Sequence, residues 1–397
     1  MINIKTLKNI YKNEFYPFLE NLGYKNVPLL VRGKNTYDYS VLRNFLETEI
    51  SRSNSPLNKE NLNEFLYNKL FFEKNNYHYV YNLSSFFSNS KNIEYTDIEE
   101  VLKNPVLHLN DTLSDFIPSN ELELCNTKVI TEFSKGKTLV SQIQFLFFIE
   151  ELAFVKKGDI NLFCCVDINL ESNFLSFKFN HNLIDNLEDK TKLLDKLIIK
   201  LQSSLDILKD FNIKITTHNE TTVKRTIQNL FIELSDQAEK LLQKQVDSGV
   251  ERKIKEFLDD IKVPQTSDYI KQIISVAYQH VSKSFEKPLF KDGWAFRFVF
   301  KEGDNTRASS SNDDLDPVYS KQVYWNLKEL MFREKGTDFI EAGLLWYTDK
   351  GASPVSIKIE QKNNLIILQY YRKEYNVIKR KEKEQYVLRK IRSGIPK

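Results

Sequence analysis

Residues 160–179 read INLFCCVDINLESNFLSFKF, and this stretch decides the expected fold class. Two runs of strand length, 160–168 and 174–179, are rich in Ile, Leu, Val and Phe. A short polar connection containing Asn, Glu and Ser joins them. Two such runs with a polar connection of this length are typical of a β-hairpin. The stretch therefore predicts antiparallel β-structure near the middle of the chain.

Strands and helices are expected on the N-terminal side of this hairpin. The segments 77–83 and 127–134 have the composition of strands. We predict helices at 2–22, 58–74 and 139–154. In 2–22, apolar residues recur at spacings of three and four, and Pro17 is expected to end or kink this helix. The sequence SKGKT (134–138) lies directly before the helix predicted at 139–154.

The C-terminal half predicts a helical segment followed by β-structure. Residues 220–286 carry apolar residues at helical spacing, broken at Ser248-Gly249 and Pro264. They predict either three antiparallel helices or a long helical arm with a helical hairpin. WAFRFVF (294–300) alternates like a strand, and a helix is expected at 318–335. Three more strands are expected at 338–348, 354–360 and 364–371, the last two joined by a tight turn at Asn363-Asn364.

These expectations define an α+β protein with several parts. A mixed N-terminal domain, a central helical segment and a C-terminal antiparallel β-rich domain are expected, followed by a basic tail. Their bounds are 1–217, 218–287, 288–371 and 372–397.

Composition restricts the class of protein. The three cysteines, Cys125, Cys164 and Cys165, lack the spacing of a zinc site. No segment is apolar and long enough to span a membrane, and the first residues do not resemble a secretory signal. We therefore expect a cytoplasmic protein with no membrane contact.

The C-terminal segment 372–397 carries ten Lys and Arg residues but three Glu, although the whole chain has a net charge of only +3. Basic residues attract phosphate groups irrespective of base sequence. The segment therefore predicts a nucleic-acid contact, with a solvated terminal helix as the alternative. The candidate residues are Lys379, Arg380, Lys381, Lys383, Arg389, Lys390 and Arg392.

Two motifs suggest chemistry. Gly136, Lys137 and Thr138 precede a predicted helix and could hold an anion at its N-terminus, although a phosphate loop would need a further Gly. An ordinary turn is the alternative.

Asp349 with Glu360 and Lys362 has the spacing of an acid followed by E-x-K, which some metal-dependent nucleases use. The alternative is the solvated face of a β-hairpin. Mg²⁺ is the cofactor that this second set would take, and nothing else in the sequence indicates one.

The polar stretch GDNTRASSSNDDLDP (303–317) lies between two predicted elements. Its first residues are turn formers, and Asp316-Pro317 has the pattern of a helix start. The remaining residues 306–315 exceed a minimal connection, so we expect a mobile or partner-ordered loop there.

In size and composition, the Lys-, Asn- and Phe-rich chain resembles the toxin components of AbiGii-type abortive-infection (phage-defence) systems. No short motif carries this resemblance, so it assigns no residue. It implies an effector acting on nucleic acid or a nucleic-acid machine, with a cognate antitoxin as partner. Two alternatives remain open: a Mg²⁺-dependent nuclease using Asp349, Glu360 and Lys362, and a non-enzymatic scaffold that binds a protein through the helical segment.

Overall fold

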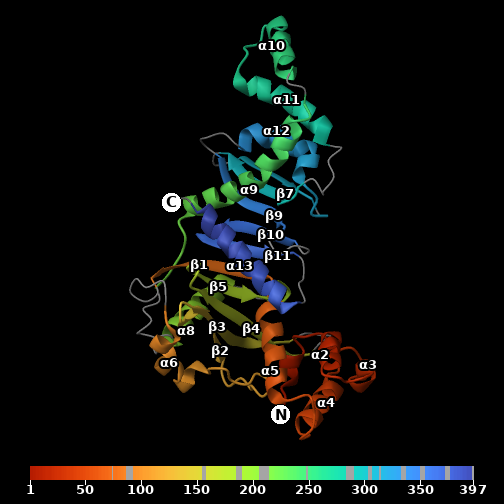
Figure 1. Ribbon diagram of the computed structural model, residues 1–397, viewed down its shortest axis with the longest axis vertical. Coiled ribbons are helices and arrows are strands. Elements are labelled where there is room, and N and C mark those ends of the chain that lie inside the picture. Colours follow the sequence, from red (N-terminus) through yellow and green to blue (C-terminus); the bar gives the residue numbers. More distant parts are fainter. Residues whose placement is uncertain are drawn as a thin grey trace. The chain divides into compact units, whose positions relative to one another are not determined.

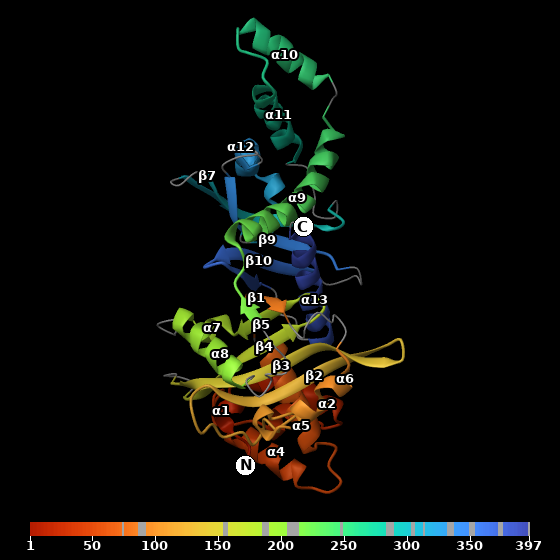
Figure 2. The ribbon, with the colours of Figure 1, turned by 90° about the vertical axis from the view of Figure 1, so that its left-hand side faces the viewer.

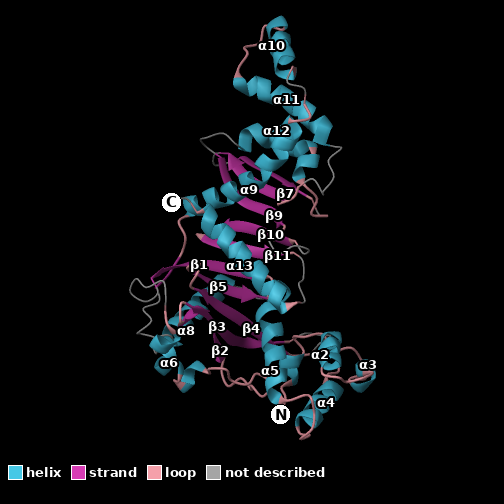
Figure 3. Ribbon diagram, viewed as in Figure 1, coloured by secondary structure: helices cyan, strands magenta, loops and turns pink. Residues whose placement is uncertain are grey.

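The structure is a computed structural model and forms two compact units (Figure 1). One contains Met1–Thr216 with Glu374–Lys381, and the other contains Thr217–Lys373 with Glu382–Lys397. The residues that the structure describes are 1–73, 75–85, 93–153, 158–184, 190–204, 214–246, 249–282, 290–302, 306–312, 314–331, 337–348, 354–371 and 376–395. Helices and antiparallel strands both contribute (Figure 3), and the α+β class is confirmed.

The first unit begins with short helices that share a core of their own. They are α1 (Ile4–Leu7), α2 (Phe15–Asn21), α3 (Val27–Leu30), α4 (Ser40–Ile50) and α5 (Lys59–Asn68). The expectation of one helix over 2–22 is wrong, because the chain turns after α1. The Asn9 amide donates to the carbonyls of Thr6 and Asn161, which gives the end of α1 its hydrogen-bond partners.

The first unit also contains a sheet with the order β2-β3-β4-β5-β1, and β6 (Lys214–Thr216) pairs with β1. Its strands are β1 (Tyr77–Ser85), β2 (Glu123–Ser134), β3 (Lys137–Leu152), β4 (Ile160–Asn169) and β5 (Phe174–Phe179). The predicted hairpin is confirmed as β4 and β5, with Asn169 opposite Phe174. The other helices of this unit are α6 (Tyr95–Leu102), α7 (His181–Ile184) and α8 (Lys190–Ser204).

The helix expected over 139–154 is wrong, since this segment forms strand β3. Residues Phe145–Ile149 are all buried, so consecutive side chains meet protein on both faces of the sheet. A strand buried on both faces shows a continuous apolar run instead of alternation, and such a run resembles a buried helix.

The second unit combines the predicted helices with a second group of strands. The helices are α9 (Glu220–Gln243), α10 (Val250–Asp260), α11 (Ser267–Ser282) and α12 (Gln322–Met331), as the apolar spacing predicts. The strands β7 (Gly293–Glu302), β8 (Thr306–Ser311), β9 (Thr337–Trp346), β10 (Val355–Lys362) and β11 (Leu365–Tyr370) take the order β11-β10-β9-β7-β8.

Helix α9 crosses strands β7 and β9 of the second unit (Figure 1). The ring of Phe231 on α9 lies 5.7 Å from Phe298 and 5.1 Å from Phe339, centroid to centroid. The predicted turn is confirmed, because Asn363 and Asn364 both have positive φ between β10 and β11. Asn tolerates this conformation better than most residues.

Two expectations for the stretch 303–317 are wrong. Residues Thr306–Ser311 form β8, which pairs with β7 from Arg297 opposite Ser311 to Glu302 opposite Thr306. A 3₁₀ turn, Val318–Ser320, follows Pro317, and α12 starts only at Gln322. A strand at the edge of a sheet pairs with one neighbour and needs few buried apolar residues. Its polar sequence is therefore hard to distinguish from that of a loop.

The segment 372–397 contains the helix α13 (Val377–Gly394), whose residues belong to both units. Three of its apolar side chains are buried: Val387, Leu388 and Ile391. In the described part of the chain, no helix is both long and apolar enough to cross a membrane.

Candidate functional site

The proposed nuclease residues lie in the second unit, and two of the three can be placed. Glu360 and Lys362 are on β10, whereas Asp349 lies outside the described residues. The Lys358 ammonium is 2.9 Å from the Glu360 carboxylate and 3.7 Å from that of Glu341, which is opposite Glu360 on β9. Glu360 is therefore paired with a cation of its own strand.

Arg297 of β7 extends this group of charges through a hydrogen bond to Glu341. Partial burial would lower the pKa of Arg297, but the hydrogen bond and charge of Glu341 outweigh it and raise the pKa. The described residues contain no group of three His, Cys, Asp or Glu side chains arranged to hold a metal ion. What the described geometry contains is a row of alternating charges on neighbouring strands.

Gly136, Lys137 and Thr138 are not at a helix start. Lys135 and Gly136 have φ of 51° and 78° and form the two-residue turn between β2 and β3. Positive φ at both positions is characteristic of the type I′ hairpin turn. The expected helix dipole is absent at this position, and Lys137 bonds to Glu94. The phosphate hypothesis thus loses its physical basis.

The seven basic candidates of α13 differ in accessibility. Lys379, Arg389 and Arg392 are exposed, whereas Arg380 and Lys383 are buried. Arg380 donates to the carbonyl of Asn75 at 2.9 Å, and Lys381 lies 4.7 Å from the centre of the Phe72 ring. Lys390 pairs with Glu233 at 2.5 Å. Three of the seven thus lie open to solvent as a phosphate contact would require.

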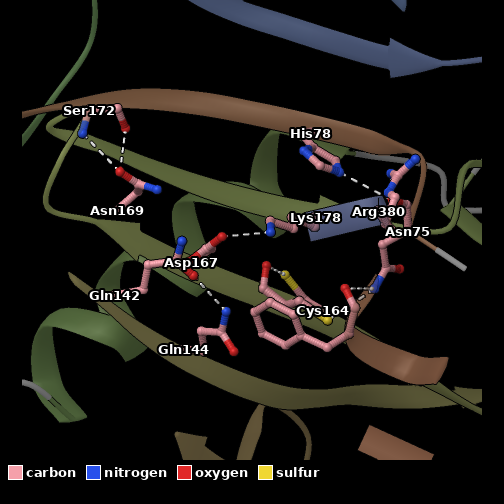
Figure 4. Close-up of polar contacts among 12 residues, drawn as sticks. Asn75, His78, Gln142, Gln144, Cys164, Asp167, Asn169, Ser172, Lys178 and Arg380 are labelled. Carbon is pink, nitrogen blue, oxygen red and sulfur yellow. Dashed lines mark hydrogen bonds and ion pairs between the residues drawn. The ribbon is translucent and has the colours of Figure 1, made fainter. Parts of the chain in front are cut away.

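A buried polar cluster occupies one face of the sheet in the first unit (Figure 4). The Lys178 ammonium of β5 is 2.6 Å from the Asp167 carboxylate of β4, and their side chains are only 2% and 7% exposed. Gln144 of β3 is opposite Asp167, and it accepts a hydrogen bond from Tyr67 at 3.0 Å. Burial raises the pKa of Tyr67 well above its ordinary value, so its hydroxyl remains a donor.

Aromatic rings enclose this cluster. The Lys178 ammonium lies 4.9 Å and 5.4 Å from the centres of the Phe71 and Phe72 rings. His78, opposite Lys178 on β1, bonds to the carbonyl of Asn75 at 3.1 Å (Figure 4). Since these side chains are almost fully buried, a substrate has no access to them. The arrangement is suited to specifying one packing of the sheet rather than to catalysis.

A pocket of about 350 Å³ that the sequence does not indicate lies among α9, α11 and α12 of the second unit. Glu239 of α9 accepts a hydrogen bond from Tyr324 at 3.0 Å and pairs with Lys328 of α12 at 2.9 Å. Tyr278 of α11 forms part of its wall. Partial burial and the charge of Glu239 raise the pKa of Tyr278, which keeps its hydroxyl protonated. No motif indicates this site, because its polar residues come from three helices.

The second unit also exposes apolar side chains on α10 and α11, which extend away from its strands in both views (Figures 1 and 2). The inner side of this pair has a small core of Ile254, Leu258 and Ile270. Phe257 of α10 and Ile261, which directly follows the helix, are 51% and 49% exposed. Tyr269 and Val276 are exposed on α11. Half-exposed large apolar residues at helical spacing are typical of a contact surface.

Comparison with known proteins adds no family. No protein-family model matches the chain, and no curated protein sequence matches it significantly. The resemblance to AbiGii-type toxins therefore remains a hypothesis, and no residue role is transferred from it.

Proposed function

We propose that the protein is an interaction protein that assembles through the exposed side of α10. The observation that carries this proposal is the pair Phe257 and Ile261, two large apolar residues four positions apart that are each about half exposed and lie outside the core shared with α11. Apolar area removed from water contributes about 25 cal/mol per Å², so covering these side chains favours association.

The charges beside this pair of residues favour a second copy of the same chain. Four charged residues of α10 form two pairs within the helix, Lys255 with Glu251 at 2.7 Å and Arg252 with Glu256 at 3.9 Å, and Asp259 makes no ion pair within the described residues. Lys253 and Asp260, which flank Phe257, make no ion pair within the described residues. Two copies of α10 packed antiparallel around Phe257 bring Lys253 of one copy opposite Asp260 of the other. A two-fold axis repeats each such contact.

Charge reversal tests this proposal without touching the core. Lys253→Glu or Asp260→Lys alone turns two attractive contacts into repulsive ones, which should weaken the dimer by about 1–2 kcal/mol, or roughly 5–30-fold in Kd. The double variant Lys253→Glu/Asp260→Lys restores the attraction. Phe257→Glu should give a monomer.

Sedimentation equilibrium over a wide concentration range measures these dissociation constants, and circular dichroism checks that α10 stays helical. A wild-type protein that is monomeric at every concentration contradicts the proposal. So does a double variant that is no better than the two single variants. Because Glu256 is paired within its own helix, Glu256→Gln serves as the control and should leave Kd unchanged.

The defence role implied by the resemblance is a separate proposal. If assembly serves such a role, cells producing the Phe257→Glu variant should lose protection against phage infection while the charge-swapped double variant keeps it. The nuclease alternative predicts that Glu360→Ala abolishes Mg²⁺-dependent cleavage of nucleic acid, and cleavage that persists in this variant excludes Glu360 from the chemistry.

A further inference from the structure

The pocket among α9, α11 and α12 has a rigid inner end. Glu239 and Lys328 are only 15% and 14% exposed, and each Glu239 oxygen has a partner, Tyr324 or Lys328. The Lys328 ammonium also lies 5.8 Å and 5.6 Å from the ring centres of Tyr278 and Trp325. Groups held in this way are positioned before a ligand arrives, which reduces the entropy that binding costs.

The outer part of the pocket has two charged groups of opposite sign. Asp236 lines it from α9 and Lys271 lines it from α11, and both are exposed. Neither makes an ion pair with any residue that the structure describes. Between them, Ile274 and Tyr278 of α11 provide apolar surface. A ligand that satisfies both charges must carry a cationic and an anionic group at once.

The size of the pocket limits the ligand. Its volume of about 350 Å³ is near the lower end of known small-molecule sites. A nucleotide with its phosphates would place several negative charges beside Asp236 and Glu239, which like-charge repulsion disfavours. A small zwitterion places one charge of each sign and a short apolar body.

We propose that this pocket binds a small zwitterion carrying an ammonium and a carboxylate group, of the amino-acid class. Asp236 receives the ammonium group, Lys271 receives the carboxylate, and the body of the ligand packs on Ile274 and Tyr278. This site is distinct from the α10 surface and does not depend on assembly.

Isothermal titration with two series of probes tests the proposal. The first series is the free α-amino acids, and the second is β-alanine, γ-aminobutyrate and ε-aminocaproate, whose charges are progressively farther apart. Matched probes with a single charge are the corresponding amines and carboxylic acids. At least one zwitterion should bind at least tenfold more tightly than both of its single-charge analogues.

Variants locate the binding. Asp236→Asn and Lys271→Met should each weaken that zwitterion at least tenfold. Two variants serve as controls and should have no effect, namely Lys240→Met on α9 and Asp268→Asn on α11, because both residues are exposed and neither lines the pocket.

Three results overturn the proposal: no zwitterion binds at millimolar concentration, a single-charge analogue binds equally well, or neither pocket variant weakens binding. Repeating the titration with Phe257→Glu separates this result from the assembly proposal, since the pocket should bind equally in the monomeric variant.

Discussion

The ion pair between Asp167 and Lys178 leads to a sharp prediction about stability. Asp167→Ala removes the carboxylate that lies 2.6 Å from an ammonium group only 2% exposed. Removing one partner of a buried pair costs about 3–5 kcal/mol, because the remaining ammonium group loses the carboxylate opposite it and stays out of water.

The lower end of this range applies here, because Lys178 keeps its contacts with the rings of Phe71 and Phe72. We therefore expect a loss of about 3 kcal/mol in the free energy of unfolding. For a cooperative unit of roughly 200 residues, this loss lowers Tm by about 6–12 °C. The double variant Asp167→Leu/Lys178→Met removes both charges and should recover most of the stability.

Denaturant unfolding followed by circular dichroism measures this difference. Trp294, Trp325 and Trp346 all belong to the second unit, so Trp fluorescence provides a separate probe for the unit that is not mutated. Asp159→Ala is the control, because Asp159 is 49% exposed, lies 3.7 Å from Lys5 and should contribute less than about 1 kcal/mol. If Asp167→Ala costs no more than Asp159→Ala, the pair is not the buried contact described above.

Three further predictions concern other parts of the chain. Burial raises the pKa of the Cys125 and Cys164 thiols. Ellman's reagent at mildly alkaline pH should therefore react with them only after unfolding, and fast reaction of these thiols in the folded protein would contradict their burial. Gly136→Ala should lower the free energy of unfolding by about 1 kcal/mol, because Gly136 has a positive φ. Inorganic phosphate should leave the Tm of the wild type and of this variant unchanged, and stabilisation of the wild type alone would restore the anion-site hypothesis. Charge reversal of the exposed basic residues of α13, Lys379, Arg389 and Arg392, should weaken binding to duplex DNA. It should also reduce the salt dependence of binding by roughly one charge per residue, and unchanged binding refutes a phosphate contact at these residues.

Elements whose signal is local could be predicted from the sequence. The β4–β5 hairpin needs only two apolar runs and a polar connection, and Asn363-Asn364 supplies the conformation that its turn requires. The helices α9, α10 and α11 follow from apolar spacing and from the breaks between them. In each of these cases, the residues that determine the structure lie within the element itself.

Elements whose partners are distant in the sequence could not be predicted. Strand β3 does not alternate over Phe145–Ile149, because these residues are buried on both faces of the sheet by parts of the chain distant in sequence. Strand β8 has a loop-like composition and becomes a strand only through pairing with β7. Likewise, the E-x-K spacing of Glu360 and Lys362 is visible in the sequence. The position of Glu341 opposite Glu360 depends on the register between β9 and β10, which the sequence does not show.

By itself, the sequence determined the fold class, the helical segment and the accumulation of basic residues near the C-terminus, because composition and short-range periodicity express these properties directly. The tertiary structure alone decided that four of the seven basic candidates of α13 are wholly or partly covered, that Asp167 meets Lys178, and that three helices enclose a charged pocket. Burial and charge pairing depend on residues brought together from separate elements, and one sequence read in order does not contain that information.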